Sequence, residues 1–421
     1  MIRSALFSLL CLGLSMGLLS AVEIPRSPEL PKEMPWDLKQ LAVAPKFEWT
    51  DTKAPLKALL YAGEKFQGKP SRVFAYYGTP AMFDPAQKGP WPGIVLVHGG
   101  GGTAFREWVT LWAKRGYAAI AMDLGGMRPD DTDNKKRERI TDGGPDQGHP
   151  AKFETIRTED ITDDWPYHAV ANVILAHSLL LSFPEVIQDK TALTGISWGG
   201  YTTCLVASID ARFKAAVPVY GCGFLNENSS WLDQFEKLGP EMTKRWVSLY
   251  DPSRYLPACR VPIFFVGGTN DFAYPLDSYM KSYDEVTHAP KNIREQVKMP
   301  HGHGPGWAPA EIGAFVDSVL LGKAKLPKVS MPGRKGDAVG VMVTDAPVAS
   351  VEAHYTMDDG PINKMEWTDA IPGTGRTQGG AFFIGATVPA NARAVFFNVK
   401  TESGLMMSSP VLLRPSAPAA K

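Results

Sequence analysis

The sequence has few cysteines, and this shortage excludes two classes of protein. Four cysteines occur in 421 residues, and one of them, Cys11, lies in the apolar N-terminal stretch. The other three are too few for a disulfide-dependent scaffold. They have no closely spaced histidine partners, so no metal site and no cofactor is expected. Cys222 and Cys259 lie beside successive predicted strands, which leaves one disulfide between them open.

An excess of charge of either sign is also absent. Lys plus Arg and Asp plus Glu number 44 each, so the composition gives no reason to expect a nucleic-acid or membrane-surface partner. The composition, with 44% hydrophobic and 21% charged residues, is that of an ordinary globular protein.

Long hydrophobic runs are absent except at the N-terminus. Arg3, the apolar stretch 5–19 and the small residues Ser20 and Ala21 follow the order of a secretory signal peptide. The sequence therefore predicts a signal peptide over residues 1–21, a secreted or periplasmic protein, and no integral membrane segment after cleavage. An uncleaved anchor is the alternative.

The remaining sequence predicts two domains. Residues 22–55 are predicted to be an N-terminal extension that packs on the core. Over residues 56–322, short apolar strands alternate with helices, which favours a mostly parallel sheet with helices on both faces. Residues 124–163 lose this periodicity and are predicted to form a long surface excursion near a site, and residues 224–258 to form a helical cap. The predicted strands are 73–77, 93–97, 117–122, 190–193, 213–220, 261–267 and 293–298, and the predicted helices are 104–115, 164–182, 276–286 and 309–321.

The C-terminal part has a different composition. Lys, Pro and Gly predominate over residues 323–335, which is typical of a linker. Short β-type runs follow at 339–344, 351–355, 381–387 and 394–399, with no competing helical pattern. An Ig-like β-sandwich over residues 336–421 is predicted, and the alternative is an irregular extension of the first domain.

The most informative motif is Gly195-Ile196-Ser197-Trp198-Gly199, which joins a predicted strand to a predicted helix. A serine on such a sharp turn needs small neighbours two residues away, and the turn exposes its hydroxyl at the helix N-terminus. The pattern predicts a nucleophile. A glycine-rich turn capped by a serine is the alternative.

A second glycine-rich loop, His98 to Gly102, follows the strand 93–97. Glycines let backbone N–H groups approach a developing oxyanion closely. Gly100 and Trp198 are predicted to supply the two oxyanion-hole donors, and His98 is predicted to be structural. The rival interpretation, a phosphate-binding loop, lacks the Lys-Ser/Thr ending of that motif.

The acid and the base are predicted at later strand ends. Asp271 ends the strand 261–267 in a Gly-rich turn, where its carboxylate can orient a histidine. The alternative role for Asp271 is a helix N-cap. Two histidines follow the last strand, and we expect His303, which has glycines on both sides, to be the base, with His301 as the competitor.

Residues 56–322 with these motifs resemble the α/β-hydrolase superfamily. Gly195-x-Ser197-x-Gly199-Gly200-Tyr201 and Gly302-His303-Gly304-Pro305-Gly306 look like the prolyl oligopeptidase (S9) catalytic domain. The stretch Asp123-Leu124-Gly125 and the compact layout look more like acetyl xylan esterases and dienelactone hydrolases. The segment 22–97 is too short for the β-propeller gate of the S9 family, which counts against a peptidase.

The resemblance implies a serine hydrolase with Ser197, His303 and Asp271 as its triad. The expected reaction is cleavage of a small-molecule or polysaccharide ester, such as an acetyl xylan or aryl ester, through an acyl-enzyme. An S9-type peptidase and a non-catalytic polysaccharide-binding protein are the alternatives. Trp231, Trp246 and Trp307 are candidates to line the substrate site, or else belong to the core.

Overall fold

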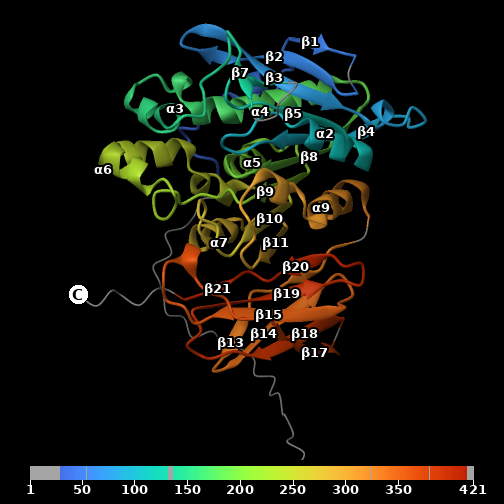
Figure 1. The fold of residues 1–421 in the computed structure, drawn as a ribbon, viewed down its shortest axis with the longest axis vertical. Helices are drawn as coiled ribbons and strands as arrows, with labels where there is room; N and C mark the ends of the chain where they lie inside the picture. Colours follow the sequence, from blue (N-terminus) through green and yellow to red (C-terminus); the bar gives the residue numbers. More distant parts are fainter. Residues whose placement is uncertain (1–28, 54, 131–135, 324, 379, 415–421) are drawn as a thin grey trace, which may run out of the picture.

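The structure, a computed structural model, describes residues 29–53, 55–130, 136–323, 325–378 and 380–414. A mixed sheet forms its centre (Figure 1), with a parallel part of strand order β5-β4-β8-β9-β10-β11. Antiparallel strands β1, β2 and β3 extend the sheet beyond β5. The bounds are β1 Phe47–Asp51, β2 Lys57–Phe66, β3 Lys69–Gly78, β4 Trp91–Val97, β5 Ala118–Met122, β8 Val186–Ile196, β9 Ala215–Val219, β10 Ile263–Gly268 and β11 Lys291–Gln296.

Helices cover both faces of this sheet. The chain passes from β4 to β5 in one direction along the sheet and from β8 to β9 in the other. Right-handed crossovers therefore put α2 and α5 on opposite faces. Helix α4 packs on α5, and α9 lies beside α2, where Arg115 pairs with Asp317. The bounds are α2 Arg106–Arg115, α4 Trp165–Ser182, α5 Trp198–Ile209, α7 Leu276–Glu285 and α9 Ala310–Leu321.

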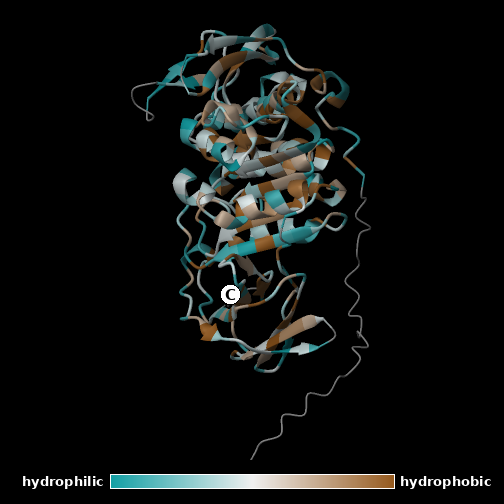
Figure 2. Ribbon diagram, turned by 90° about the vertical axis from the view of Figure 1, so that its right-hand side faces the viewer, coloured by the Kyte–Doolittle hydropathy of each residue, from teal (hydrophilic) through white to brown (hydrophobic). Residues whose placement is uncertain are grey.

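The alternating strands and helices predicted for residues 56–322 are present, with ends shifted by a few residues. Strand β8 is longer than predicted because polar residues at 188–190 continue it beyond its apolar part. Helix α2 ends at Gly116, whose left-handed φ of 106° and N–H bonds to the last turn fit the predicted cap. Hydrophobic residues concentrate in the central strands and in the helices that lie on them (Figure 2).

Residues 124–163 form more structure than the predicted surface excursion. Strands β6 (Met127–Pro129) and β7 (Arg137–Arg139) pair with each other, and the short helix α3 (His149–Lys152) follows. Phe153 and Ile156 are buried in the main core, which anchors the segment. The predicted cap at 224–258 contains α6 (Leu232–Tyr250), which is kinked at Gly239 before Pro240.

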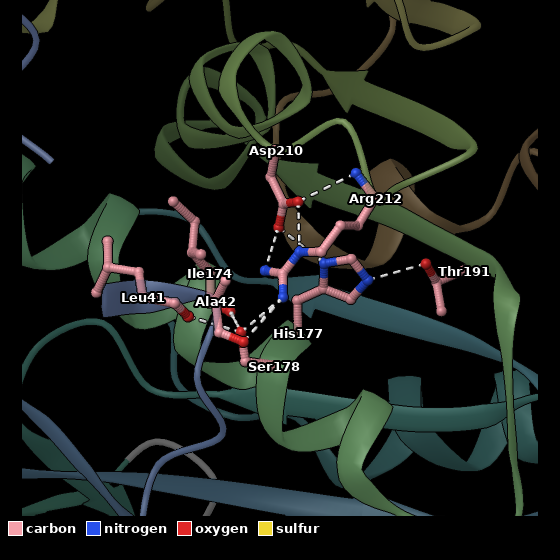
Figure 3. A network of polar contacts seen from close by, with 8 residues as sticks. All are labelled: Leu41, Ala42, Ile174, His177, Ser178, Thr191, Asp210 and Arg212. Carbon is pink, nitrogen blue, oxygen red and sulfur yellow. Dashed lines mark hydrogen bonds and ion pairs between the residues drawn. The ribbon is translucent and has the colours of Figure 1, made fainter. Parts of the chain in front are cut away.

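The described part of the N-terminal extension packs on the core, through α1 (Leu38–Leu41) and β1. A buried polar network fixes it there (Figure 3). Ser178 of α4 donates its hydroxyl proton to the carbonyl of Leu41, and Arg212 donates to Ser178. Arg212 also pairs with Asp210, which accepts from His177. The network therefore joins the extension, α4 and the loop before β9.

The C-terminal part contains two groups of antiparallel strands that share an apolar core. Its residues include Val341 of β14, Ile384 of β18 and Phe397 of β19. Strand β20 pairs with β11, so one group continues the central sheet (Figure 1). The first group is β15 Ser350–Thr356, β16 Ile371–Pro372, β19 Ala394–Lys400, β20 Met406–Ser408 and β21 Leu412–Leu413, and the second is β12 Lys328–Val329, β13 Gly333–Lys335, β14 Ala338–Thr344, β17 Thr374–Gln378 and β18 Ala381–Thr387.

Two sequence-based expectations need correction here. The segment 323–335 is not only a linker, because β12 and β13 within it pair with β14. Cys222 and Cys259 do not form a disulfide, since both are free, buried thiols. The predicted signal peptide, residues 1–21, lies outside the described residues. In the part of the chain that the structure describes, no helix has the length and apolar character needed to cross a membrane.

Candidate active site

Ser197 lies on the sharp turn between β8 and α5. Its backbone has φ 59° and ψ −119°, a conformation that residues other than glycine rarely adopt. The flanking glycines are required by close backbone contacts. A Cβ on Gly195 would lie 2.2 Å from the carbonyl oxygen of Gly199, and one on Gly199 would lie 2.0 Å from that of Val97. The Gly-x-Ser-x-Gly pattern is therefore a requirement of this turn, because its geometry leaves no space for a side chain at positions 195 and 199.

His301 and Asp271 complete a hydrogen-bonded chain with this serine. The Nε2 atom of His301 lies 3.0 Å from the Ser197 hydroxyl, and its Nδ1 lies 2.6 Å from Oδ2 of Asp271. The other carboxylate oxygen of Asp271 accepts the N–H groups of Ala273 and Tyr274, both at 2.8 Å. An ionised carboxylate only accepts, so Nδ1 of His301 carries the proton and Nε2 accepts from the serine.

His303, the expected base, is not in this chain. Its Nε2 accepts the N–H of Gly99 at 2.9 Å, and its ring lies against Phe105. Burial, together with the nearby His98 and His301, lowers the pKa of His303 to about 4, so this acceptor stays neutral. His303 is the first residue of the short helix α8 (His303–Trp307), which directs its ring toward the glycine loop. The expectation that His303 lies between Ser197 and Asp271 is wrong, and His301 occupies that place.

The glycine loop packs directly on the turn that carries Ser197. A Cβ on Gly99 would lie 2.9 Å from Cβ of Ser197, and one on Gly100 would lie 3.1 Å from the Trp198 ring. The N–H of Gly99 is used by His303, whereas that of Gly100 has no partner among the described residues. Trp198 is the first residue of α5, where N–H groups lack partners within the helix. Gly100 and Trp198 are thus adjacent, as the predicted donor pair requires.

His98 has the arrangement expected of a structural residue. It is buried, its Nδ1 lies 2.7 Å from the carbonyl oxygen of Gly99, and its Nε2 accepts the N–H of Leu124 at 2.9 Å. These two contacts use both ring nitrogens and connect the glycine loop to the end of β5. His98 therefore holds the loop in place and has no nitrogen left for proton transfer.

The three candidate tryptophans lie in different surroundings. Trp246 is fully buried and donates its indole N–H to the carbonyl of Lys152, so it belongs to the core and not to a substrate site. Trp231 is largely buried against the ring of Trp198, at 4.5 Å between centroids. Trp307 packs on Phe105, beside the ring of His303.

Two further side chains near the site were not singled out in the sequence. Phe272, which follows Asp271, is 60% exposed and its ring centroid lies 5.0 Å from that of His301. Lys152 is only 4% exposed, and its ammonium lies 4.6 Å from the centroid of the Trp198 ring. Lys152 lies in the aperiodic segment 124–163, where no sequence pattern indicates which side chains are buried. Within the described ranges, no group of three or more His, Cys, Asp or Glu is arranged to hold a metal ion.

Comparisons with known proteins agree with this fold. The structure is similar to that of an acetyl xylan esterase from Paenibacillus sp. R4, with a TM-score of 0.54 and 19% identity over 67% of this chain and 92% of that one. An acetyl xylan esterase 1 from Thermoanaerobacterium sp. gives a TM-score of 0.53 and 14% identity, over 70% and 95% of the two chains. The fold is that of an α/β-hydrolase. Residues 79–304 match the model of the dienelactone hydrolase family, and the chain belongs to that family.

Sequence relatives cover only part of the chain. The acetyl esterase Axe7A of Xylanibacter ruminicola is 24% identical over 233 residues, which are 53% of this chain and 52% of that protein. The human mitochondrial acyl-coenzyme A thioesterase 2 is 29% identical over 153 residues, or 36% and 25% of the two chains. The chain thus spans about half the length of Axe7A and a quarter of the thioesterase.

Proposed function

We propose that the protein is a serine hydrolase that cleaves carboxylic esters through Ser197, His301 and Asp271. The observation that carries the proposal is the hydrogen-bonded chain from Asp271 through His301 to a serine on a strained strand-to-helix turn. This arrangement gives a nucleophile, a base and an orienting carboxylate their required contacts. The similarity to acetyl and acetyl xylan esterases supports the ester as the bond that is cleaved.

The proposed reaction has two halves. His301 Nε2 takes the proton of Ser197 as Oγ attacks the ester carbonyl, and Asp271 stabilises the imidazolium that forms. The N–H groups of Gly100 and Trp198 bind the oxyanion of the tetrahedral intermediate. His301 returns the proton to the leaving alcohol, which leaves an acyl-enzyme on Ser197. His301 then takes a proton from water as the water oxygen attacks the acyl-enzyme, and returns it to Oγ of Ser197 as the Oγ–acyl bond breaks and the acid is released.

The substrate is proposed to be a small-molecule or polysaccharide ester, with acetyl esters as the first class to test. Phe272 offers an exposed aromatic surface beside His301, on the side where the alcohol departs. Aromatic faces pack well against sugar or aryl rings. Trp231 and Trp307 are more covered than Phe272, so we assign the alcohol side to Phe272 first.

Two properties of the whole protein belong to the proposal. We propose secretion or a periplasmic location from the signal-peptide pattern of residues 1–21. We also propose that residues 336–421 form an Ig-like β-sandwich domain. The two strand groups with a shared apolar core support this assignment, and the short strands β12 and β13 move its start into the segment 323–335.

A fluorophosphonate probe and 4-nitrophenyl acetate together test the catalytic role of Ser197. The wild type is expected to react with the probe at Ser197 and to hydrolyse the ester, whereas Ser197→Ala loses labelling and about 10⁴-fold or more in kcat. Ser208→Ala on the same helix is the matched control and keeps both, because the Ser208 hydroxyl donates to the carbonyl of Cys204 and lies about three helical turns from Ser197. Hydrolysis retained by Ser197→Ala would falsify the mechanism. Cleavage of aminoacyl-4-nitroanilides in preference to the ester would instead indicate a peptidase.

A further inference from the structure

A buried, unpaired lysine lies beside the proposed oxyanion donors. Lys152 is 4% exposed, and its ammonium lies 4.6 Å from the ring centroid of Trp198 and 4.9 Å from that of Trp165. A Cβ built on Gly100 would lie 3.8 Å from its Nζ. The side chain therefore reaches the same two residues, Gly100 and Trp198, that are proposed to bind the oxyanion.

The ammonium of Lys152 has no hydrogen bond or ion pair with any of the described residues. Burial lowers the pKa of Lys152, and the nearby carboxylate of Asp146 raises it by a smaller amount. The net result is a pKa of about 7. An ammonium on a largely buried side chain without an anionic partner is costly, and lysines with strongly perturbed pKa values cluster at functional sites. Two indole faces compensate part of that cost.

A second buried donor without a partner lies on the same segment. The side-chain oxygen of Gln147 accepts the N–H of Gly101 at 3.2 Å, which fixes the orientation of the amide. Its Nε2 atom is buried and has no hydrogen-bond partner among the described residues. Two unpaired donors, one of them cationic, thus lie next to the glycine loop.

We propose that Lys152, assisted by Gln147, recognises a carboxylate on the acyl part of the ester substrate. This inference rests on the proposed ester hydrolysis at Ser197 and specifies its substrate class. We assign the carboxylate to the acyl part of the ester because Lys152 and His301 lie on different sides of Ser197. His301 must reach the leaving alcohol and contacts Tyr220 and Phe272, whereas Lys152 lies over the ring of Trp198, on the side of Gly100. The preferred substrate is therefore a half-ester of a dicarboxylic acid.

The test compares two esters, one with a free carboxylate and one in which a methyl group blocks that carboxylate. These are the mono-4-nitrophenyl ester of a dicarboxylic acid and the same compound with its free carboxylate blocked as a methyl ester, prepared for glutarate, adipate and suberate. For the best chain length, the wild type is expected to prefer the charged ester by about tenfold to a hundredfold in kcat/KM, the range for a hydrogen bond between charged groups. Lys152→Met is expected to lose this preference and to hydrolyse the blocked ester within about twofold of the wild type.

Controls separate this inference from the proposed function. Lys152→Gln is a second neutral variant, which covers the case that Lys152→Met does not fold. Lys114→Met, on the outer side of α2 over Phe83, removes a lysine remote from the site and keeps the preference. The inference is overturned if the wild type does not prefer the charged ester at any chain length, if the preference persists without Lys152, or if both esters lose activity equally. Absence of 4-nitrophenyl acetate hydrolysis by the wild type would refute the proposed function itself.

Discussion

Two regions of the molecule contain the same chain of carboxylate, imidazole and hydroxyl. At the candidate site, Asp271, His301 and Ser197 are joined by distances of 2.6 and 3.0 Å. Between α4 and β8, the corresponding atoms of Asp210, His177 and Thr191 are joined by distances of 2.8 and 2.9 Å (Figure 3). The order of atoms is the same, from carboxylate to Nδ1 and from Nε2 to hydroxyl.

The surroundings of the two chains differ. The His301 side chain is 13% exposed and Ser197 lies at a helix N-terminus, whereas His177 is fully buried and Thr191 lies within β8. Burial alone would raise the pKa of Asp210, but the hydrogen bonds from His177 and Arg212 outweigh it and hold the pKa well below its usual range. A hydrogen-bonded chain of carboxylate, imidazole and hydroxyl is therefore not sufficient to define a catalytic site. What sets the candidate site apart is that its hydroxyl lies at a helix N-terminus, beside backbone donors that an oxyanion could use.

The largest expected effect is a loss of kcat that distinguishes His301 from His303. His301→Gln removes the proposed base and is expected to reduce kcat for 4-nitrophenyl acetate by on the order of 10⁴-fold. His303→Gln keeps a side-chain acceptor near Gly99 and is expected to cost less than about tenfold. Steady-state kinetics of both variants decides. The reverse order of losses would restore His303 as the base.

The second expected effect is on stability and involves the buried chain. His177→Gln disrupts the hydrogen bond to the Asp210 carboxylate and the stacking on Phe213, and is expected to lower the free energy of unfolding by about 3 kcal/mol. Its kcat/KM is expected to stay within about twofold of the wild type. Urea unfolding and kinetics on the same preparation measure both. Thr191→Val, which removes only the hydroxyl, is the milder control, at about 1 kcal/mol. Loss of activity at unchanged stability would assign the buried chain a catalytic role.

The smallest expected effect is a difference in pH dependence. Burial lowers the pKa of His177 in the folded protein, although Asp210 opposes the shift. Below about pH 6.5 the unfolded chain therefore binds a proton at this position that the folded chain does not. The contribution of His177 to stability is present above pH 6.5 and is lost as the pH falls below it. His177→Phe is expected to reduce the slope of unfolding free energy between pH 5 and 6.5 by roughly 1 kcal/mol per pH unit. An unchanged slope would contradict a neutral buried His177.

The sequence allowed some of these residues to be predicted and not others, for physical reasons. Ser197 was found because the turn that exposes it excludes side chains at Gly195 and Gly199, which leaves a local pattern. His301 and His303 are two residues apart in one loop, and only the course of the chain into α8 decides which ring faces Ser197. Lys152 leaves no local signal, because its neighbours come from distant segments.

The same contrast holds for the fold. Most of the longer strands and helices of residues 56–322 have apolar residues at regular spacing, so they were predictable, whereas β2 and the short elements of residues 124–163 were not predicted. The short strands β12 and β13 contain two and three residues, too few to show a periodic pattern, and both pair with β14. The continuation of the central sheet into the C-terminal part depends on a contact between Ile293 and Ser408. No local pattern encodes a pairing across more than a hundred residues.

The pairing of β20 with β11 has a consequence for solubility. Without it, β11 would be an edge strand with a row of free N–H and C=O groups, the surface on which sheets of different molecules join. The chain covers part of this edge with its own later strand, β20, which pairs with β11 at Ile293. The same unit also holds the loops on either side of the site, since Asn270 donates to the carbonyl of Met365 and Lys298 pairs with Glu366. The C-terminal part thus both covers a sheet edge and supports the loops that carry Asp271 and His301.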